Sequence, residues 1–308
     1  MDNTSNIKNI TDLYLRKMKT ISIDGRDITG LSSGIEELDK ITHGFQEGDL
    51  ITIAGRPAIG KSSLALSMVK SIAVDHRKPV IYISPSMTGE KIAKRLLSIV
   101  GRVPLDHIIS GMLSVEEWET LERGTIGLRE SPIYILDTPG ICIDKLEEQV
   151  CMYSKQNKVK AVFIDYLQLV QSKGNPNWNR NDEVTDVVCR LKSLAMTLNV
   201  PFIIISQTNR PEHKETTNAI YTPKLSDLRD SGTIEDLSDI VMFVHCPEYH
   251  HVYHDEYGND LRGITELYIE KNLTGHRNRI RLKSNYDIAS FESSQSQHLS
   301  FNTPFGIF

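Results

Sequence analysis

From residue 49 onward the chain alternates short apolar runs with stretches of helical periodicity, and this alternation restricts the fold more than any other feature. Apolar runs at 49–55, 79–84, 132–137, 159–165 and 200–206 predict strands. The helices expected between them begin at Lys61 and Thr88 and cover 143–153 and 184–198. Because nearly continuous apolar strands indicate a parallel sheet covered on both faces, we expect an α/β fold. Later runs at 239–244, 264–271 and 279–283 predict an antiparallel extension of the sheet.

Composition excludes several classes of protein. The chain has 308 residues, of which 39% are hydrophobic and 24% charged, so wholesale disorder and a disulfide-dense scaffold are excluded. No apolar window reaches the roughly 18 residues of a membrane-spanning helix, and residues 1–15 lack the layout of a secretory signal. We therefore expect a cytoplasmic protein without a membrane partner. We predict buried thiols at the widely spaced Cys142, Cys151, Cys189 and Cys246.

The net charge of the chain restricts any binding of nucleic acid to local contacts. With 35 basic and 40 acidic residues, the formal net charge is −5. A general electrostatic coating of nucleic acid is therefore excluded, and any contact must be local.

Both ends of the chain differ from its centre. Residues 7–19 predict a short amphipathic helix, which must bury its apolar stripe on its own domain or on a neighbouring subunit. We divide the chain into a docking helix and linker at 1–28, a main domain at 29–292 and a tail at 293–308. The tail is first polar and then apolar, so we expect it to pack on the main domain or the next subunit, or else to recruit a partner.

The segment GRPAIGKS at 55–62 carries the clearest chemical signal. It follows an expected strand and opens an expected helix, which is the context of a phosphate-binding loop. Its glycines let N–H groups turn towards phosphate oxygens, Lys61 reaches the β- and γ-phosphates, and the Ser62 hydroxyl ligates Mg²⁺. The residues predicted to bind the nucleotide are Gly55, Arg56, Pro57, Ala58, Ile59, Gly60, Lys61, Ser62 and Ser63.

Two later strands end in polar residues that suit this loop. Asp165 ends one apolar strand, and a carboxylate at the carboxyl end of a parallel strand points into the same crevice, where it holds the magnesium directly or through water. Gln207 ends the next strand, where its amide is placed to sense the γ-phosphate or to orient water. The alternative for Gln207 is a solvated strand-end residue.

The order of these motifs resembles the RecA-like motor domain of DnaB-type replicative helicases. The resemblance is carried by the segment around the phosphate loop at 30–63, VFIDYLQL at 162–169, IISQTNR at 204–210 and LSDLRDSGTIEDLSDIVMF at 225–243. It implies a RecA-like P-loop NTPase fold, ATP and Mg²⁺ as cofactors, and a homo-hexameric ring with nucleotides between subunits. The helix at 7–19 would dock on the adjacent subunit, and we expect the family's separate N-terminal helical domain to be absent.

The resemblance also implies single-stranded DNA in the central channel of the ring, gripped by loops that follow two of the strands. The residues expected to contact DNA are Lys173, Arg180, Arg229, Asp230 and Gly232. Arginine pairs with phosphate, and glycine allows a close backbone approach. Trp178 in the first loop is either a base-stacking platform or a loop anchor.

Two positions depart from the family pattern. The family's serine-leucine-glutamate-methionine run supplies a glutamate as general base, whereas this chain has Ser86 at that position. A serine is a far weaker base, and a general base typically contributes about 10²–10⁴ in rate. Glu90 lies one helical turn further on and could substitute only if that turn is distorted.

The second departure concerns the catalytic groups that the family lends to the neighbour's nucleotide. Aligned without gaps, the family's lysine is Lys271, but its arginine finger falls on Leu273. Loss of such a finger costs about 10³–10⁵ in hydrolysis. Arg277 or Arg279 could reach instead, although both follow Gly275 on a different stretch of the loop.

The sequence therefore predicts an ATP-dependent DNA helicase motor for replication, with Lys61, Asp165, Gln207 and Lys271 as catalytic residues and Ser62 and Asp165 as magnesium ligands. The alternative is a catalytically weakened ring that binds ATP and DNA or recruits a partner. Primase and a helicase loader are the other partners expected. The histidine-rich segment 245–254 fits no regular zinc spacing, so we expect a solvated loop there, with a metal site as the alternative.

Overall fold

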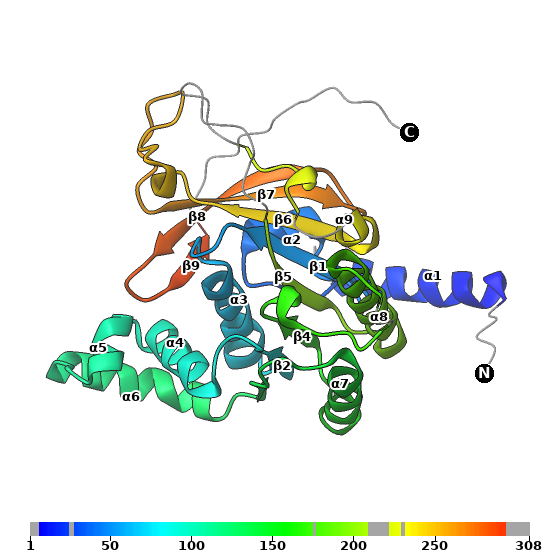
Figure 1. Cartoon of the computed structure of the whole chain (residues 1–308), viewed down its shortest axis with the longest axis horizontal. Coiled ribbons are helices and arrows are strands. Elements are labelled where there is room, and N and C mark those ends of the chain that lie inside the picture. The colour runs from blue at the N-terminus through cyan, green and yellow to red at the C-terminus, as the bar shows by residue number, and fades with distance from the viewer. Residues whose placement is uncertain (1–5, 25–27, 175–176, 209–221, 229–231, 294–308) are drawn as a thin grey trace.

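The computed structural model describes residues 6–24, 28–174, 177–208, 222–228 and 232–293. Within these ranges the strands form one nine-stranded sheet in the order β3-β2-β4-β5-β1-β6-β7-β8-β9 (Figure 1). The strands are β1 (Leu50–Gly55), β2 (Val80–Ile83), β3 (Ile133–Leu136), β4 (Ala161–Ile164), β5 (Phe202–Gln207), β6 (Ile240–His245), β7 (Ile264–Asn272), β8 (Asn278–Asn285) and β9 (Ser290–Ser293).

The sheet is parallel from β3 to β6 and antiparallel from β6 to β9. The expected α/β sheet is confirmed, but the assignment of 239–244 to the antiparallel extension was wrong, because β6 pairs with β1 in parallel. The chain reaches β6 through a short helix that returns it to the edge where β1 begins, and Asp239 N donates to Leu50 O there.

Helices cover both faces of the sheet. They are α1 (Ile7–Asp24), α2 (Glu36–Thr42), α3 (Lys61–Val69), which continues as a π-helical turn η1 (Lys70–Asp75), α4 (Gly89–Gly101), α5 (Leu105–Ser110), α6 (Val115–Arg129), α7 (Ile143–Asn157), α8 (Arg180–Leu198) and α9 (Gly232–Leu237). Short 3₁₀ turns lie at η2 (Leu167–Leu169), η3 (Leu225–Asp227) and η4 (Glu248–His250). The sequence predicted α1, α3, α4, α7 and α8 but missed α2, α5, α6 and α9. The start of α6 was readable, since Ser114 and Glu117 form a capping box.

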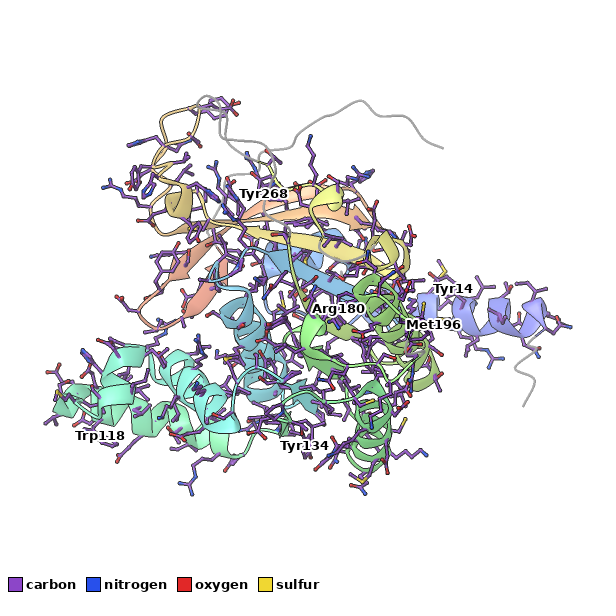
Figure 2. The ribbon with its side chains drawn as sticks, in the orientation of Figure 1. Tyr14, Trp118, Tyr134, Arg180, Met196 and Tyr268 are labelled. Carbon is purple, nitrogen blue, oxygen red and sulfur yellow. The ribbon has the colours of Figure 1, made fainter. Side chains whose placement is uncertain are left out.

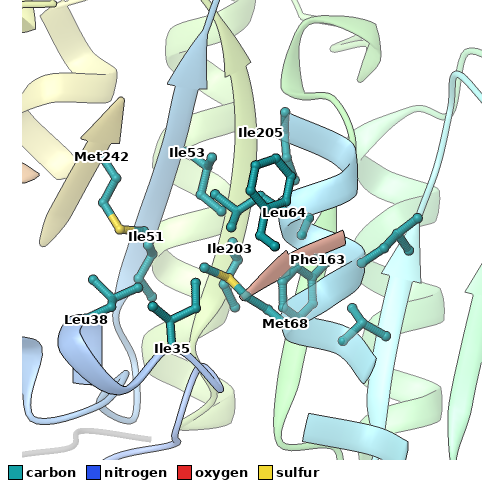
Figure 3. Close-up of a cluster of buried hydrophobic side chains, with 14 of the residues drawn as sticks. Ile35, Leu38, Ile51, Ile53, Leu64, Met68, Phe163, Ile203, Ile205 and Met242 are labelled. Carbon is teal, nitrogen blue, oxygen red and sulfur yellow. The ribbon is translucent and has the colours of Figure 1, made fainter. Parts of the chain in front are cut away.

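Two apolar cores lie on the two faces of the sheet. Because side chains alternate along a strand, Ile51 and Ile53 of β1 face α3, as Figure 3 shows, whereas Leu50 and Ala54 belong to the opposite core with α7 and α8. Strands buried on both faces explain the continuous apolar runs in the sequence. They also fix the carboxyl ends of the parallel strands, where the predicted site lies.

The thiols differ from the expectation. Cys246 is buried, Cys142 and Cys151 are half-buried, and Cys189 is exposed on α8. The prediction was therefore wrong for Cys189, because α8 buries neighbours such as Val188 and Leu191 and leaves Cys189 at the surface.

The helix α1 confirms the predicted amphipathic helix and extends it to Asp24. In Figure 1 it projects from the body of the molecule. Its large apolar side chains from Ile7 to Met18 are exposed, and Leu13 is 70% exposed. No helix in the described part of the chain is long and apolar enough to cross a membrane.

Candidate nucleotide-binding site

The predicted phosphate loop connects β1 to α3 at the carboxyl edge of the parallel strands. Two of its residues adopt left-handed backbone, with φ of 62° at Ala58 and 97° at Gly60. A Cβ on Gly55 would lie 2.9 Å from the carbonyl oxygen of Val244, and one on Gly60 would lie 2.9 Å from the ring of Phe291. Close packing therefore favours glycine at both positions, and the left-handed backbone favours it at position 60 as well.

Lys61 is 8% exposed and points back into this loop. Its Nζ donates to the carbonyl oxygens of Gly55 at 2.8 Å and Arg56 at 2.7 Å. Burial lowers the pKa of Lys61 to about 8, and the charge of Asp165 acts in the opposite direction. The ammonium group and the carboxylate thus lie within electrostatic reach of each other.

Asp165 directly follows β4 and is 2% exposed. Its Oδ2 accepts a hydrogen bond of 2.8 Å from the hydroxyl of Tyr82, which is fully buried on β2. Burial, followed by the charge of Asp165, raises the pKa of Tyr82 well above 10, so this hydroxyl remains a donor. Sequence reasoning missed Tyr82, because an apolar strand such as β2 gives a tyrosine no distinguishing pattern.

The donor set at this edge fits magnesium. Mg²⁺ prefers oxygen ligands and is usually bound by one or two carboxylates together with substrate phosphates and waters. The Ser62 hydroxyl in the first turn of α3 and the Asp165 carboxylate after β4 are such ligands. Ser62 is half-buried, as is suitable for a group that must meet both protein and ligand.

Gln207 ends β5 beside the loop, since it pairs in register with Gly55 of β1. Its backbone N–H donates to Oε1 of Gln168 at 3.3 Å, and Nε2 of Gln168 donates to the hydroxyl of Ser206 at 2.9 Å. The structure therefore brings Gln207 to the phosphate loop. It also identifies Gln168, which sequence reasoning missed, as the side chain that joins the ends of β4 and β5.

The candidates for the general base are also at this edge. Ser86 is exposed after β2, and its hydroxyl donates to the carbonyl oxygen of Asp165 at 3.1 Å. Glu90 lies in the first turn of α4 and forms an ion pair with Lys94 at 2.6 Å. Hydrogen bonding to Lys94 lowers the pKa of Glu90, which makes its carboxylate a weaker base. The ion pair with Lys94 thus disfavours Glu90 as a substitute for the general base.

The residues expected to assist hydrolysis in a neighbouring subunit lie at the edge of the sheet opposite to the phosphate loop. Lys271 of β7 pairs with Val241 near the start of β6, and its Nζ donates to the carbonyl oxygens of Glu235 at 2.6 Å and Asp236 at 3.0 Å. Because β7 runs antiparallel to β6, the β7–β8 turn is at the amino edge of the parallel strands. The turn therefore cannot reach the phosphate loop of its own chain.

Leu273 at the position of the arginine finger and its two possible substitutes, Arg277 and Arg279, differ in their surroundings. Leu273 is 65% exposed, and Arg277 is also exposed. Arg279 is half-buried on β8, where its guanidinium lies over the ring of Tyr268 and 3.6 Å from Glu266. Arg279 is thus held inside its own chain, and Arg277 remains the better placed of the two substitutes.

The predicted DNA loops follow β4 and β5. Lys173 is exposed after η2, while the Trp178 ring packs so closely on Gly174 that a Cβ there would lie 1.9 Å from it. This packing supports the reading of Trp178 as a loop anchor. Arg180 at the start of α8 donates to Glu183 at 2.6 Å and to the carbonyl oxygen of Gln168 at 2.5 Å (Figure 2).

The second DNA segment is only partly described. Arg229 and Asp230 lie outside the described residues. Gly232 is exposed at the start of α9, which packs on α8 through a hydrogen bond of 3.1 Å between the hydroxyls of Thr185 and Thr233. The structure thus brings Gly232 near the beginning of α8, in the same region as Arg180.

The first residues of the histidine-rich segment are buried, whereas we expected a solvated loop over the whole segment. His245 and Cys246 are buried, and the His245 ring stacks on that of His250 with centroids 5.1 Å apart. Burial lowers the pKa of His245 to about 4. The reason is that β6 extends to His245 and is covered there by β7. The residues placed by the structure contain no cluster of metal-ligating side chains.

Comparison with known proteins agrees with this geometry. Residues 30–293 match the family described as DnaB-like helicase C terminal domain. The chain is 35% identical over 276 residues to the replicative DNA helicase DnaC of Bacillus subtilis (strain 168), a match that covers 89% of this chain and 59% of that protein. It is 33% identical over 279 residues to the replicative DNA helicase DnaB of Geobacillus stearothermophilus, with coverage of 89% and 60%. The chain thus spans about three fifths of these relatives.

Solved structures give the same assignment. One that is described as an ATPase domain superimposes with a TM-score of 0.83 at 27% identity, covering 96% of this chain and 100% of that one. A DnaB-like replicative helicase, described with its interactions with primase, gives a TM-score of 0.81 at 27% identity and covers 96% of this chain and 68% of its own. These similarities confirm the expected RecA-like fold. By sequence and by fold, the chain belongs to the DnaB-like helicase C-terminal domain family.

Proposed function

We propose that this chain is an ATP-hydrolysing motor that translocates on single-stranded DNA as a homo-hexameric ring and unwinds DNA in replication. The observation that carries the proposal is the meeting of Lys61, Ser62 and Asp165 at one edge of the sheet, in a chain of the DnaB-like family. Lys61 would bind the β- and γ-phosphates after releasing the carbonyl oxygens of Gly55 and Arg56. Mg²⁺ held by Ser62 and Asp165 would neutralise phosphate charge.

Catalysis in this proposal requires a second subunit. Lys271, Leu273 and Arg277 lie at the amino edge of the parallel strands, whereas the phosphate loop lies at the carboxyl edge. A group from the β7–β8 turn can therefore assist hydrolysis only on the nucleotide of a neighbouring copy. This arrangement favours sites shared between subunits.

Two apolar surfaces support such an assembly. One is the exposed stripe on α1. The other is a groove of about 710 Å³ along α6, where the exposed Trp118 and Ile126 and the buried Leu121 are flanked by charged residues. Figure 2 places Tyr14 on α1 and Trp118 on α6 at opposite ends of the molecule. Because the two surfaces are at opposite ends, we propose that α1 docks on α6 of an adjacent copy and so builds the ring.

The test is ATP turnover with and without single-stranded DNA. We expect DNA to stimulate turnover, and Lys61→Ala to abolish both nucleotide binding and turnover while the fold is retained. Lys70→Ala is the matched control, because Lys70 lies further along the same helical stretch and pairs with Asp75 at 2.9 Å. Unchanged nucleotide affinity of Lys61→Ala in calorimetry would overturn the assignment of the phosphate loop.

A specific observation favours a second candidate, a ring that binds ATP and DNA but hydrolyses slowly. Ser86 and Leu273 stand where the resemblance leads us to expect the family's general base and arginine finger. Binding of ATP and DNA by an intact ring, without DNA-stimulated turnover, would select this candidate. In either case we propose primase or a helicase loader as a further partner, because a related helicase has been described with primase.

A further inference from the structure

The hydroxyl of Tyr82 lies at the nucleotide site, bonded to the carboxylate of Asp165. Tyr82 pairs with Phe163 in the register of β2 and β4, and the two rings stack with centroids 6.1 Å apart. Asp165 lies two residues beyond Phe163, a rise of about 6.6 Å along a strand. The side chain of Tyr82 closes this distance, since its hydroxyl ends 2.8 Å from Oδ2 of Asp165.

The bond matters because the carboxylate is buried. A buried charged group must be hydrogen-bonded to remain in place. In the part of the chain that the structure describes, Tyr82 is the side chain that donates to the carboxylate of Asp165, whereas Ser86 donates to its carbonyl oxygen. The phenol ring is itself fixed by the core around it, so it can orient one oxygen and leave the other for the ion.

We propose that Tyr82 is a positioning residue that orients the Asp165 carboxylate towards the magnesium of the nucleotide. The inference rests on the proposed function of the site. It goes beyond that function, because it assigns the affinity for magnesium partly to a residue on β2 that touches neither nucleotide nor metal. Hydrogen-bond partners of metal ligands typically contribute about 10- to 100-fold in metal affinity.

The experiment compares Tyr82→Phe with Tyr134→Phe. Tyr134 lies on the adjacent strand β3, and its hydroxyl donates to Asn157 over the same 2.8 Å. Binding of a fluorescent ATP analogue is measured across Mg²⁺ concentrations and in EDTA. We expect Tyr82→Phe to raise the half-saturating Mg²⁺ concentration about tenfold without changing binding in EDTA. Tyr134→Phe should leave both quantities unchanged.

A double-variant cycle separates positioning from a structural role. In an Asp165→Asn background, Tyr82→Phe should cause no further change in the Mg²⁺ dependence, because the residue acts only through the carboxylate. This background also removes the buried charge, so the double variant remains measurable if Tyr82→Phe alone unfolds. Equal Mg²⁺ dependence of the wild type and Tyr82→Phe, or additive effects in the cycle, would overturn the inference. Failure of the wild type to bind the analogue would instead overturn the proposed function.

Discussion

Ser86 and Asp165 are joined at the carboxyl edge of the sheet, where the serine hydroxyl donates to the aspartate carbonyl oxygen over 3.1 Å. Position 86 is therefore adjacent to the carboxylate that we assign to magnesium. A glutamate at this position would lie near the charge of Asp165, and a like charge raises the pKa of a carboxyl group. The position is thus suited to a general base, and this chain has Ser86 there instead of a carboxylate.

We expect Ser86→Glu to raise the ATP turnover number, because it supplies an acceptor for the proton of the attacking water. Ser86→Ala is the control, since it removes the hydrogen bond to Asp165 without adding a base, and its turnover should stay close to that of the wild type. Steady-state ATPase assays at saturating ATP measure the turnover number of each variant. If the wild type already turns over rapidly and Ser86→Glu brings no gain, another group acts as the general base.

Leu273→Arg should raise turnover on the neighbouring subunit and not on its own. The exposed turn that carries Leu273 is at the opposite edge of the sheet from the phosphate loop. Subunits with both Leu273→Arg and Lys61→Ala cannot bind their own nucleotide, but they should increase the ATPase rate of wild-type subunits when mixed with them. Lys61→Ala subunits alone are the control and should not. Combined with Ser86→Glu in one chain, the effect should be non-additive.

The parallel strands and the phosphate loop could be read from sequence because both depend on local patterns. Apolar runs buried on both faces are continuous, and the turn before Lys61 needs its glycines in fixed positions. The direction of β6 was not readable, because it depends on a connection formed by α9. Tyr82 and Gln168 were missed for a related reason, since their roles arise only when separate strands are brought together.

Assembly should depend on two apolar surfaces that are not adjacent in one chain. We expect Leu13→Asp on α1 and Trp118→Asp on α6 each to shift the ring towards monomers, because either change places a charge in the proposed contact. Deletion of residues 1–20 should have the same effect. Met152→Asp is the control, since Met152 is an exposed apolar residue on α7, outside both surfaces. Light scattering that shows an unchanged oligomer for the α1 and α6 variants would contradict this docking.

Lys173 and Arg180 should contribute differently to DNA binding. Lys173 is exposed, whereas the guanidinium of Arg180 is already bonded to Glu183 and to the carbonyl oxygen of Gln168. We expect Lys173→Ala to weaken binding of single-stranded DNA and to reduce its salt dependence by about one counterion. Arg180→Ala should weaken binding with little change in the salt slope, because it disturbs the loop. Titrations at several salt concentrations distinguish the two, and equal slopes for both variants would refute the distinction.

The stability of the domain should fall with pH between about 6.5 and 4 because of His245. Burial, and then the neighbouring His250, lower the pKa of His245 to about 4 in the folded chain, whereas an unfolded histidine titrates near 6.5. In this window the unfolded chain binds a proton that the folded chain does not, so the free energy of unfolding decreases as the pH falls, by up to about 3 kcal/mol. His245→Gln should flatten this dependence in denaturant titrations. His107→Gln is a control of opposite sign, because the hydrogen bond to Glu117 raises the pKa of His107, whose contribution to stability is lost as the pH rises. The same slope in the wild type and His245→Gln would show that folding does not lower the pKa of His245.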